Sequence, residues 1–333
     1  MQSVGLAEAL RQLGSPVQRD GATLFQPPAN DMIETVPPPP QRHPEGRSRP
    51  AWLRRAEQIP DLDVRYEEDR RLLWQFMAPR ERPSFTPGLI DGMTTLLDLV
   101  VDACDTAPQP PPVAYLVLAS RTPGIFNLGG DLGVFLEAIA AGDRERLRAY
   151  AHRCVRGQYR FATNLELPLC TIALVQGDAL GGGFEAALAQ QVLIAERQAK
   201  FGLPEVLFNL FPGMGAYNFL SRRISPAQAE RMIISGRVYS AEEMYELGVV
   251  DVLAENGRGI QAVYDFVGDY ERTRRTRQAA FHARTIVHPI HLDQLLKIAD
   301  LWVDAALALE PADLRKMKHL AMAQTRRWAR LQA

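Results

Sequence analysis

Two glutamates that each close a glycine-marked phrase are the residues of this sequence best suited to acid/base chemistry. Glu185 ends the phrase Ala-Leu-Gly-Gly-Gly-Phe-Glu at 179–185, and Glu205 ends Phe-Gly-Leu-Pro-Glu at 201–205. Glycine-rich turns leave backbone N–H groups exposed. Such groups donate hydrogen bonds to a developing enolate oxygen while a nearby carboxylate moves a proton. For one such phrase alone, a glycine turn followed by a surface acid is the simpler interpretation.

A third glycine phrase upstream favours a site over a set of unrelated turns. It reads Phe-Asn-Leu-Gly-Gly-Asp-Leu at 126–132 and follows the apolar run 113–118 after a short polar loop. An apolar run of this length is typical of a buried strand, so the phrase lies where a strand ends. Three such phrases in one chain predict a single site built from backbone donors and carboxylates.

In order and content, the three phrases and the Pro-Gly-Met-Gly at 212–215 resemble the enoyl-CoA hydratase/isomerase (crotonase) superfamily over residues 60–330. The amino-acid sequence of segments 126–132, 150–157 and 202–217 is most similar to that of bacterial diffusible signal factor synthases. Those relatives make cis-2-unsaturated fatty acid signals from acyl thioesters on acyl carrier protein. The resemblance implies an α/β fold: a crotonase-like ββα spiral core with a C-terminal helical region.

The resemblance also implies roles for individual residues of the three phrases. Backbone N–H groups of Gly130 and Gly182 would polarise the thioester carbonyl, with Gly129 as a neighbouring alternative to Gly130. Glu185 and Glu205 match the two acid/base carboxylates of the hydratase branch. For dehydration of a 3-hydroxyacyl thioester, Glu205 would take the C2 proton and Glu185 would protonate the leaving hydroxyl. Close strand–helix packing is the structural alternative for the glycine triplet.

An acyl chain needs a dry pocket, and in this family C-terminal helices cover the active site. The segment 291–309 carries an apolar stripe at helical spacing, which ordinary core packing also explains. The candidates for the lining of the acyl pocket are Met214, Trp302 and Leu320.

Two basic runs, at 272–277 and 326–330, are the candidate docking sites for the thioester carrier. Acyl carrier proteins are acidic and coenzyme A carries phosphates, although such runs are usually solvated helix faces. Leu128 stands where many CoA-using relatives have alanine, which weakens the CoA alternative. The family also implies a homotrimer or hexamer, and a regulatory protein is a further possible partner.

The leading functional prediction is dehydration, with or without thioester hydrolysis, of a 3-hydroxyacyl thioester to give a cis-2-unsaturated fatty acid signal. The first alternative is an enoyl-CoA hydratase/isomerase of fatty acid breakdown. The second alternative is an inactive crotonase-fold protein that binds a regulator. The two glutamates and two glycines of the site argue against inactivity.

Composition limits the other classes of function. The chain has 333 residues and a formal net charge of −1, which gives no overall field for nucleic acid or an anionic membrane. Three cysteines (Cys104, Cys154, Cys170) without metal-ligand spacing, and a His288–His291 pair interrupted by proline, predict no metal site and no disulfide framework. We expect a cytoplasmic protein that uses no cofactor and spans no membrane.

Three regions are expected along the chain. Residues 1–58 form a proline-rich tail that we expect to be disordered, 59–250 the spiral core, and 251–333 a helical region that covers the acyl pocket and aids oligomerisation. Strands and helices should alternate through the core, as is typical of α/β proteins. The predicted strands are 64–66, 72–76, 113–118, 171–175 and 192–195. One predicted helix begins at Thr86, and the others span 133–165, 226–235, 240–247, 259–270 and 291–309.

Overall fold

The large sheet of the computed structural model, which describes residues 50–107 and 110–332, is buried on both faces. Its strands run in the order β1-β2-β3-β5-β7-β10; β1 and β2 are antiparallel, and the other neighbours are parallel. Near-continuous apolar strands are what a doubly covered parallel sheet requires. The strands are β1 (Leu62–Glu67), β2 (Leu72–Met77), β3 (Tyr115–Ser120), β5 (Cys170–Val175), β7 (Val192–Glu196) and β10 (Val252–Ala254).

A second, smaller sheet is made of three-residue strands in the order β4-β6-β8-β9. Along the chain, a strand of the large sheet is followed by a strand of the small sheet and then by helical structure, and this unit repeats from β3, from β5 and from β7. The repeat is the ββα spiral that was expected. The strands are β4 (Ile125–Asn127), β6 (Asp178–Leu180), β8 (Lys200–Gly202) and β9 (Val238–Ser240).

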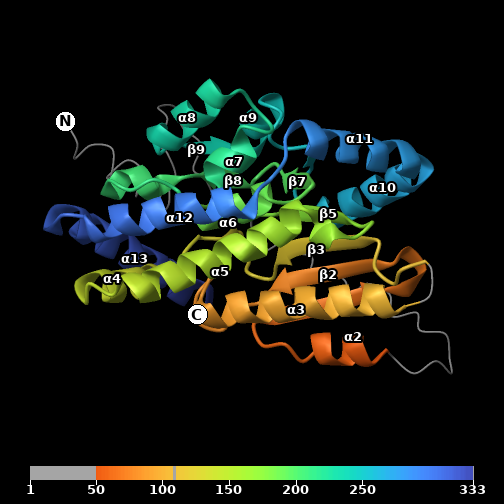
Figure 1. Ribbon diagram of the computed structural model, residues 1–333, viewed down its shortest axis with the longest axis horizontal. Coiled ribbons are helices and arrows are strands. Elements are labelled where there is room, and N and C mark those ends of the chain that lie inside the picture. Colours follow the sequence, from red (N-terminus) through yellow and green to blue (C-terminus); the bar gives the residue numbers. More distant parts are fainter. Residues whose placement is uncertain (1–49, 108–109, 333) are drawn as a thin grey trace, which may run out of the picture.

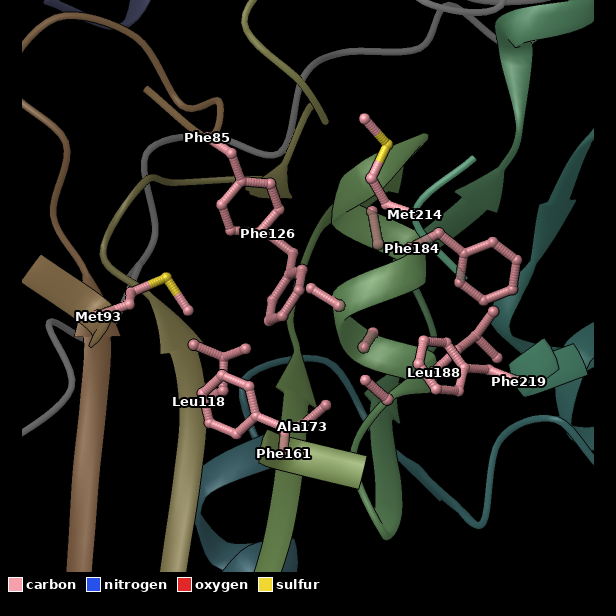
Figure 2. Close-up of a cluster of buried hydrophobic side chains, with 14 of the residues drawn as sticks. Phe85, Met93, Leu118, Phe126, Phe161, Ala173, Phe184, Leu188, Met214 and Phe219 are labelled. Atoms are coloured by element: carbon pink, nitrogen blue, oxygen red, sulfur yellow. The ribbon is translucent and has the colours of Figure 1, made fainter. Parts of the chain in front are cut away.

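Helices cover the large sheet on both faces (Figure 1). On one face α3, α5 and α6 share the main apolar cluster with residues such as Leu73 and Leu116; on the other, α10 packs on Trp74 and Ile172. Figure 2 shows part of the main cluster around α6. The helices of the core are α3 (Pro87–Thr106), α4 (Leu132–Ala140), α5 (Arg144–Ala162), α6 (Gly182–Leu188), α7 (Ala216–Leu220), α8 (Pro226–Ser235) and α9 (Ala241–Glu246).

The C-terminal region is helical, as predicted, and returns to the glycine phrases. In Figure 1, α12 lies along α5 and α13 lies beside α4, while α10 and α11 form the other end of the molecule. Ion pairs from Arg144 to Asp304 and from Arg148 to Asp300 join α5 to α12. These helices are α10 (Gly259–Arg272), α11 (Arg274–Val287), α12 (Leu292–Leu307) and α13 (Pro311–Gln332).

Two expectations from the sequence need correction. The predicted helix over 133–165 is two helices, because Gly142 adopts a φ of +62° and Asp143 caps the start of α5 through the N–H of Arg146. The predicted tail, 1–58, includes a helix, α2 (Ala51–Ala56), whose Leu53 is buried against the core. The rest of the predicted tail, residues 1–49, lies outside the described residues.

Within the described ranges, none of the helices is long and apolar enough to cross a membrane. The same part of the chain contains no group of three or more histidine, cysteine, aspartate or glutamate side chains that could hold a metal ion.

Candidate active site

One cavity of about 40 Å³ brings together the residues that the sequence singled out. Its walls come from the turn after β4, from α4, α5 and α6, from the short 3-10 helix η3 (Pro204–Phe208) and from α12 and α13. The lining includes Gly129, Gly130, Gly182, Glu185, Glu205, Met214, Trp302 and Leu320.

Glu185 lies in the first turns of α6 and is 1% exposed. Its Oε1 accepts hydrogen bonds from the N–H groups of Met214 and Ala216, both at 2.9 Å. Its Oε2 is shielded from solvent and has no partner among the described residues. Burial raises the pKa of Glu185 although the two backbone donors act in the opposite direction. One oxygen is therefore fixed, and the other is free to exchange a proton.

Glu205 lies in η3, opposite the glycine triplet. The side chain is partly exposed as a whole, yet its Oε2 is shielded from solvent and has no partner in the described ranges. Burial, and then the charge of Glu185, raise the pKa of Glu205. When one of two neighbouring carboxyl groups is charged, it opposes ionisation of the other, so the pair holds one proton between them near neutral pH. The pair therefore offers one acid and one base at the same time.

Gly181 brings the two phrases into contact. It adopts a φ of +52°, and a Cβ added there would lie 2.6 Å from Oε1 of Glu205. A side chain at this position would therefore be strained and would collide with the carboxyl group. The glycine is what allows the Glu205 carboxyl group to lie against the start of α6.

Two backbone donors lie side by side where the start of α6 meets the turn after β4. Gly182 is the first residue of α6, so its N–H has no acceptor within the helix. The N atom of Gly130 is 3.4 Å from the position that a Cβ of Gly182 would occupy. The N–H of Gly129 donates to Oδ1 of Asn127 at 2.8 Å, so it is already used. At this turn the geometry therefore favours Gly130 over Gly129 as the second donor.

Tyr150 holds this turn and was not identified as a site residue from the sequence. Its hydroxyl accepts from the N–H of Asp131 at 3.0 Å and donates to the carbonyl oxygen of Phe85. The ring of Phe135 packs edge-on against Tyr150 and lies so close to Gly130 that a Cβ there would be 2.5 Å from it. The signal in the sequence was the segment 150–157, whose wording contributed to the family resemblance.

The three residues predicted to line the acyl pocket are buried, with Met214 7%, Trp302 2% and Leu320 4% exposed. The Trp302 ring packs on Phe135, with ring centroids 4.9 Å apart. A Cβ on Gly213 would lie 2.4 Å from the Trp302 side chain. A cavity of about 40 Å³ has room for only a few atoms, so the whole acyl thioester binds only if these walls move.

A second cavity, of about 200 Å³, adjoins the first beneath α13. The two share Leu128, Pro204, Leu320 and Gln324, and the second is also lined by the arginines of the predicted basic run 326–330. Arg327 pairs with Asp178 at 2.6 Å, and Gln324 donates to the carbonyl oxygen of Leu128 at 3.2 Å.

The other basic run, 272–277, lies at the junction of α10 and α11 and lines neither cavity. Of the two candidate docking sites for the carrier, only the run at 326–330 therefore adjoins the candidate site.

Comparison with known proteins agrees with this geometry. Residues 78–257 match the family model described as enoyl-CoA hydratase/isomerase. The mitochondrial methylglutaconyl-CoA hydratase of Rattus norvegicus is 31% identical over 175 residues, which are 51% of this chain and 51% of that protein. The chain thus spans about half the length of the curated relatives it matches.

Solved structures share the fold. An enoyl-CoA hydratase from Bacillus halodurans has a TM-score of 0.64 at 22% identity, covering 78% of this chain and 99% of that one. Pseudomonas aeruginosa DspI has a TM-score of 0.54 at 26% identity, covering 64% of this chain and 75% of that one. The expected α/β crotonase fold with C-terminal helices is therefore confirmed.

Proposed function

The chain belongs to the enoyl-CoA hydratase/isomerase family, and from that premise we propose that it is a lyase that dehydrates a 3-hydroxyacyl thioester to the 2-enoyl thioester. The observation that carries the proposal is the pair of shielded carboxyl oxygens, on Glu185 and Glu205, in one cavity with two backbone donors. Elimination of water needs a base for one proton and an acid for the leaving hydroxyl, and this pair supplies both.

The thioester carbonyl oxygen lies between the N–H groups of Gly130 and Gly182 in the proposed complex. Negative charge develops on that oxygen when the C2 proton leaves, and each backbone donor of this kind is typically worth ~3 to 4 kcal/mol. Gly182 adds the positive end of the α6 dipole. Glu205 takes the C2 proton, and Glu185 gives its proton to the hydroxyl, which leaves as water.

After this step the two glutamates have exchanged protonation states. Glu185 ends as the carboxylate, whose Oε1 is stabilised by the N–H groups of Met214 and Ala216. Glu205 ends as the neutral acid, and burial together with the charge of Glu185 raises its pKa. Addition of water is the reverse of the same path.

For the substrate, we propose an acyl chain in the pocket lined by Met214, Trp302 and Leu320, carried by acyl carrier protein or CoA. The arginines of the run 326–330 adjoin the cavity and suit an acidic carrier or phosphate groups. The sequence of residues 126–132, 150–157 and 202–217 supports a cis-2-unsaturated fatty acid signal as the product, released when Glu185 or Glu205 activates water for thioester hydrolysis. The proposed assembly is a homotrimer or hexamer.

An enoyl-CoA hydratase/isomerase of fatty acid breakdown is the second candidate. The sequence similarity to a methylglutaconyl-CoA hydratase favours it, since that relative's name is that of a CoA-thioester hydratase. An inactive regulatory protein is the remaining alternative. It gives no reason for two shielded carboxyl oxygens to share a cavity with free backbone donors.

The test is to incubate the protein with 3-hydroxyacyl chains on acyl carrier protein and on CoA, and to follow enoyl products and free acids by mass spectrometry. Free 2-unsaturated acid released from the carrier protein supports the signal synthase. Enoyl-CoA without free acid supports the breakdown enzyme. Glu185→Gln should slow dehydration ~10²- to 10⁴-fold, with Glu230→Gln on the exposed face of α8 as the matched control. A near-normal rate for Glu185→Gln contradicts the mechanism.

A further inference from the structure

A narrow apolar slot of about 30 Å³ lies between α3 and α5 and adjoins the catalytic cavity. The two share Phe85, Cys154 and Gln158 as wall residues. Figure 2 shows Phe85, Met93 and Phe161 together on one side of α6, away from Phe184 and Phe219 on its other side. The slot is lined by Ile90, Met93, Leu97, Gly157, Phe161 and Ala186 beyond the shared residues.

The polar groups around this slot are already paired, with one exception. Thr94 donates its hydroxyl to the carbonyl oxygen of Ile90 within α3, and Arg153 bonds the carbonyl oxygen of Pro87 and pairs with Asp91. Gln158 differs: it is 6% exposed, and its Oε1 has no partner in the part of the chain that the structure describes. This amide lies where the slot meets the catalytic cavity.

The slot exists because α5 carries a glycine between two ion pairs. Arg153 pairs with Asp91, and two turns later Arg160 pairs with Asp98, so α3 and α5 are joined at two levels. Gly157 lies between these levels, and a Cβ placed there would meet no atom within 4 Å. The side chain of Met93 on α3 is unbranched and flexible, so this wall of the slot adapts to a bound ligand.

We propose that this slot receives the distal end of an unbranched acyl chain, and that Gly157 sets the longest chain accepted. The inference rests on the proposed function and deepens it. The catalytic cavity has room for the reacting carbons beside Glu185 and Glu205, and the chain continues past Cys154 and Gln158 between α3 and α5. An apolar chain fits because the slot offers methyl, thioether and aromatic surface and no unpaired charge.

The contact with the catalytic cavity is what selects an acyl chain as the occupant. Three residues line both cavities, so the two are adjacent, and an acyl chain that displaces these side chains extends from one into the other. A carrier group fits the larger cavity, which the arginines of 326–330 help to line and which adjoins the catalytic cavity through a different set of residues from the slot. Polar carrier, reacting carbons and apolar tail then follow one path through the molecule.

The test fills the slot from Gly157 and compares two chain lengths. Gly157→Phe places a ring in open space, and Gly268→Phe, on the exposed face of α10 where a Cβ also meets nothing within 4 Å, is the matched control. Burial of one methylene is worth about fourfold in affinity, so losing three of them costs about 60-fold. For Gly157→Phe we expect the ratio of kcat/KM for ten-carbon over four-carbon 3-hydroxyacyl-CoA to fall at least ~20-fold. The control should keep the wild-type ratio.

A binding measurement separates the slot from the reaction. Calorimetry with S-decyl-CoA and S-butyl-CoA, which lack the reacting groups, should show a decyl preference in the wild type that Gly157→Phe abolishes and Gly268→Phe retains. If no thioester is turned over but this preference behaves as described, the proposed function fails and the slot stands. Equal losses at both lengths, or an unchanged ratio, overturn the slot. Should Gly157→Phe not fold by thermal melting and gel filtration, Gly157→Leu carries the same comparison.

Discussion

Replacing Glu205 with glutamine should raise the free energy of unfolding relative to the wild type as the pH rises. Burial and the charge of Glu185 raise the pKa of Glu205 from 4.5 to about 8. Between these two values the folded state holds a proton that the unfolded state has released. The stability that this proton provides is complete below pH 4.5 and is lost as the pH rises through about 8. A glutamine does not ionise, so Glu205→Gln escapes this loss.

The magnitude follows from the two pKa values. The difference between 4.5 and about 8 is about 3.5, and at about 1.4 kcal/mol per pH unit the upper limit is about 5 kcal/mol. Between pH 5 and pH 9 we expect less than half of this limit, about 2 kcal/mol. The value is reduced because the Glu205 side chain is partly exposed and because at pH 5 the unfolded state has already ionised in part. It is reduced further because Glu185 ionises more easily in the variant, where its neighbour is neutral.

The assay is urea unfolding of wild type, Glu205→Gln and the control Glu230→Gln at pH 5 and pH 9. Any packing cost of the amide is the same at both pH values, so the change in the variant-minus-wild-type difference isolates the ionisation. For Glu205→Gln the difference in free energy of unfolding should rise by about 2 kcal/mol from pH 5 to pH 9. For Glu230→Gln it should stay constant. A constant difference for Glu205→Gln would show that the carboxyl group is well solvated, and the acid/base argument would lose its basis.

Two further predictions concern the geometry around the site and the start of the ordered chain. Gly181→Ala should lower kcat at least ~10-fold while the protein still folds, because the new Cβ would lie 2.6 Å from Oε1 of Glu205 and must displace that carboxyl group; an unchanged steady-state rate would contradict the contact. Removing residues 1–49 should leave the thermal unfolding temperature unchanged. Removing residues 1–56 should cost about 2 to 3 kcal/mol, because Leu53 is 1% exposed against the core, and equal melting curves for the two truncations would refute this.

The long elements of this fold could be predicted from the sequence because their signals are local. Thr86 accepts from the N–H of Leu89, and Pro87 occupies the first turn of α3, which is the helix start expected from the Thr-Pro pair. Continuous apolar runs became β3, β5 and β7, which are buried on both faces. These strands and caps need no knowledge of distant residues.

The small sheet could not be predicted in the same way, because its strands are three residues long. β4, β6 and β8 coincide with parts of the three glycine phrases, whose sequences indicate turns and a site but no strands. A strand of three residues shows no alternation that a window could detect. Its pairing depends on neighbours more than 20 residues away in the chain, as in Phe201 with Ala179. The phrases therefore serve as both the second sheet and the walls of the site.

The face of α5 that borders the cavity explains why the site could be predicted only in part. Tyr150, Cys154 and Gln158 follow one another at four-residue spacing and line the catalytic cavity from one helix. The spacing is visible in the sequence, but the partners are not: Tyr150 contacts Phe85 and Asp131. Ion pairs to α3 and to α12 fix this helix on both sides. The helix that orients the Gly130 turn is thus also the wall of the slot, so chain length and carbonyl position are set by one rigid element.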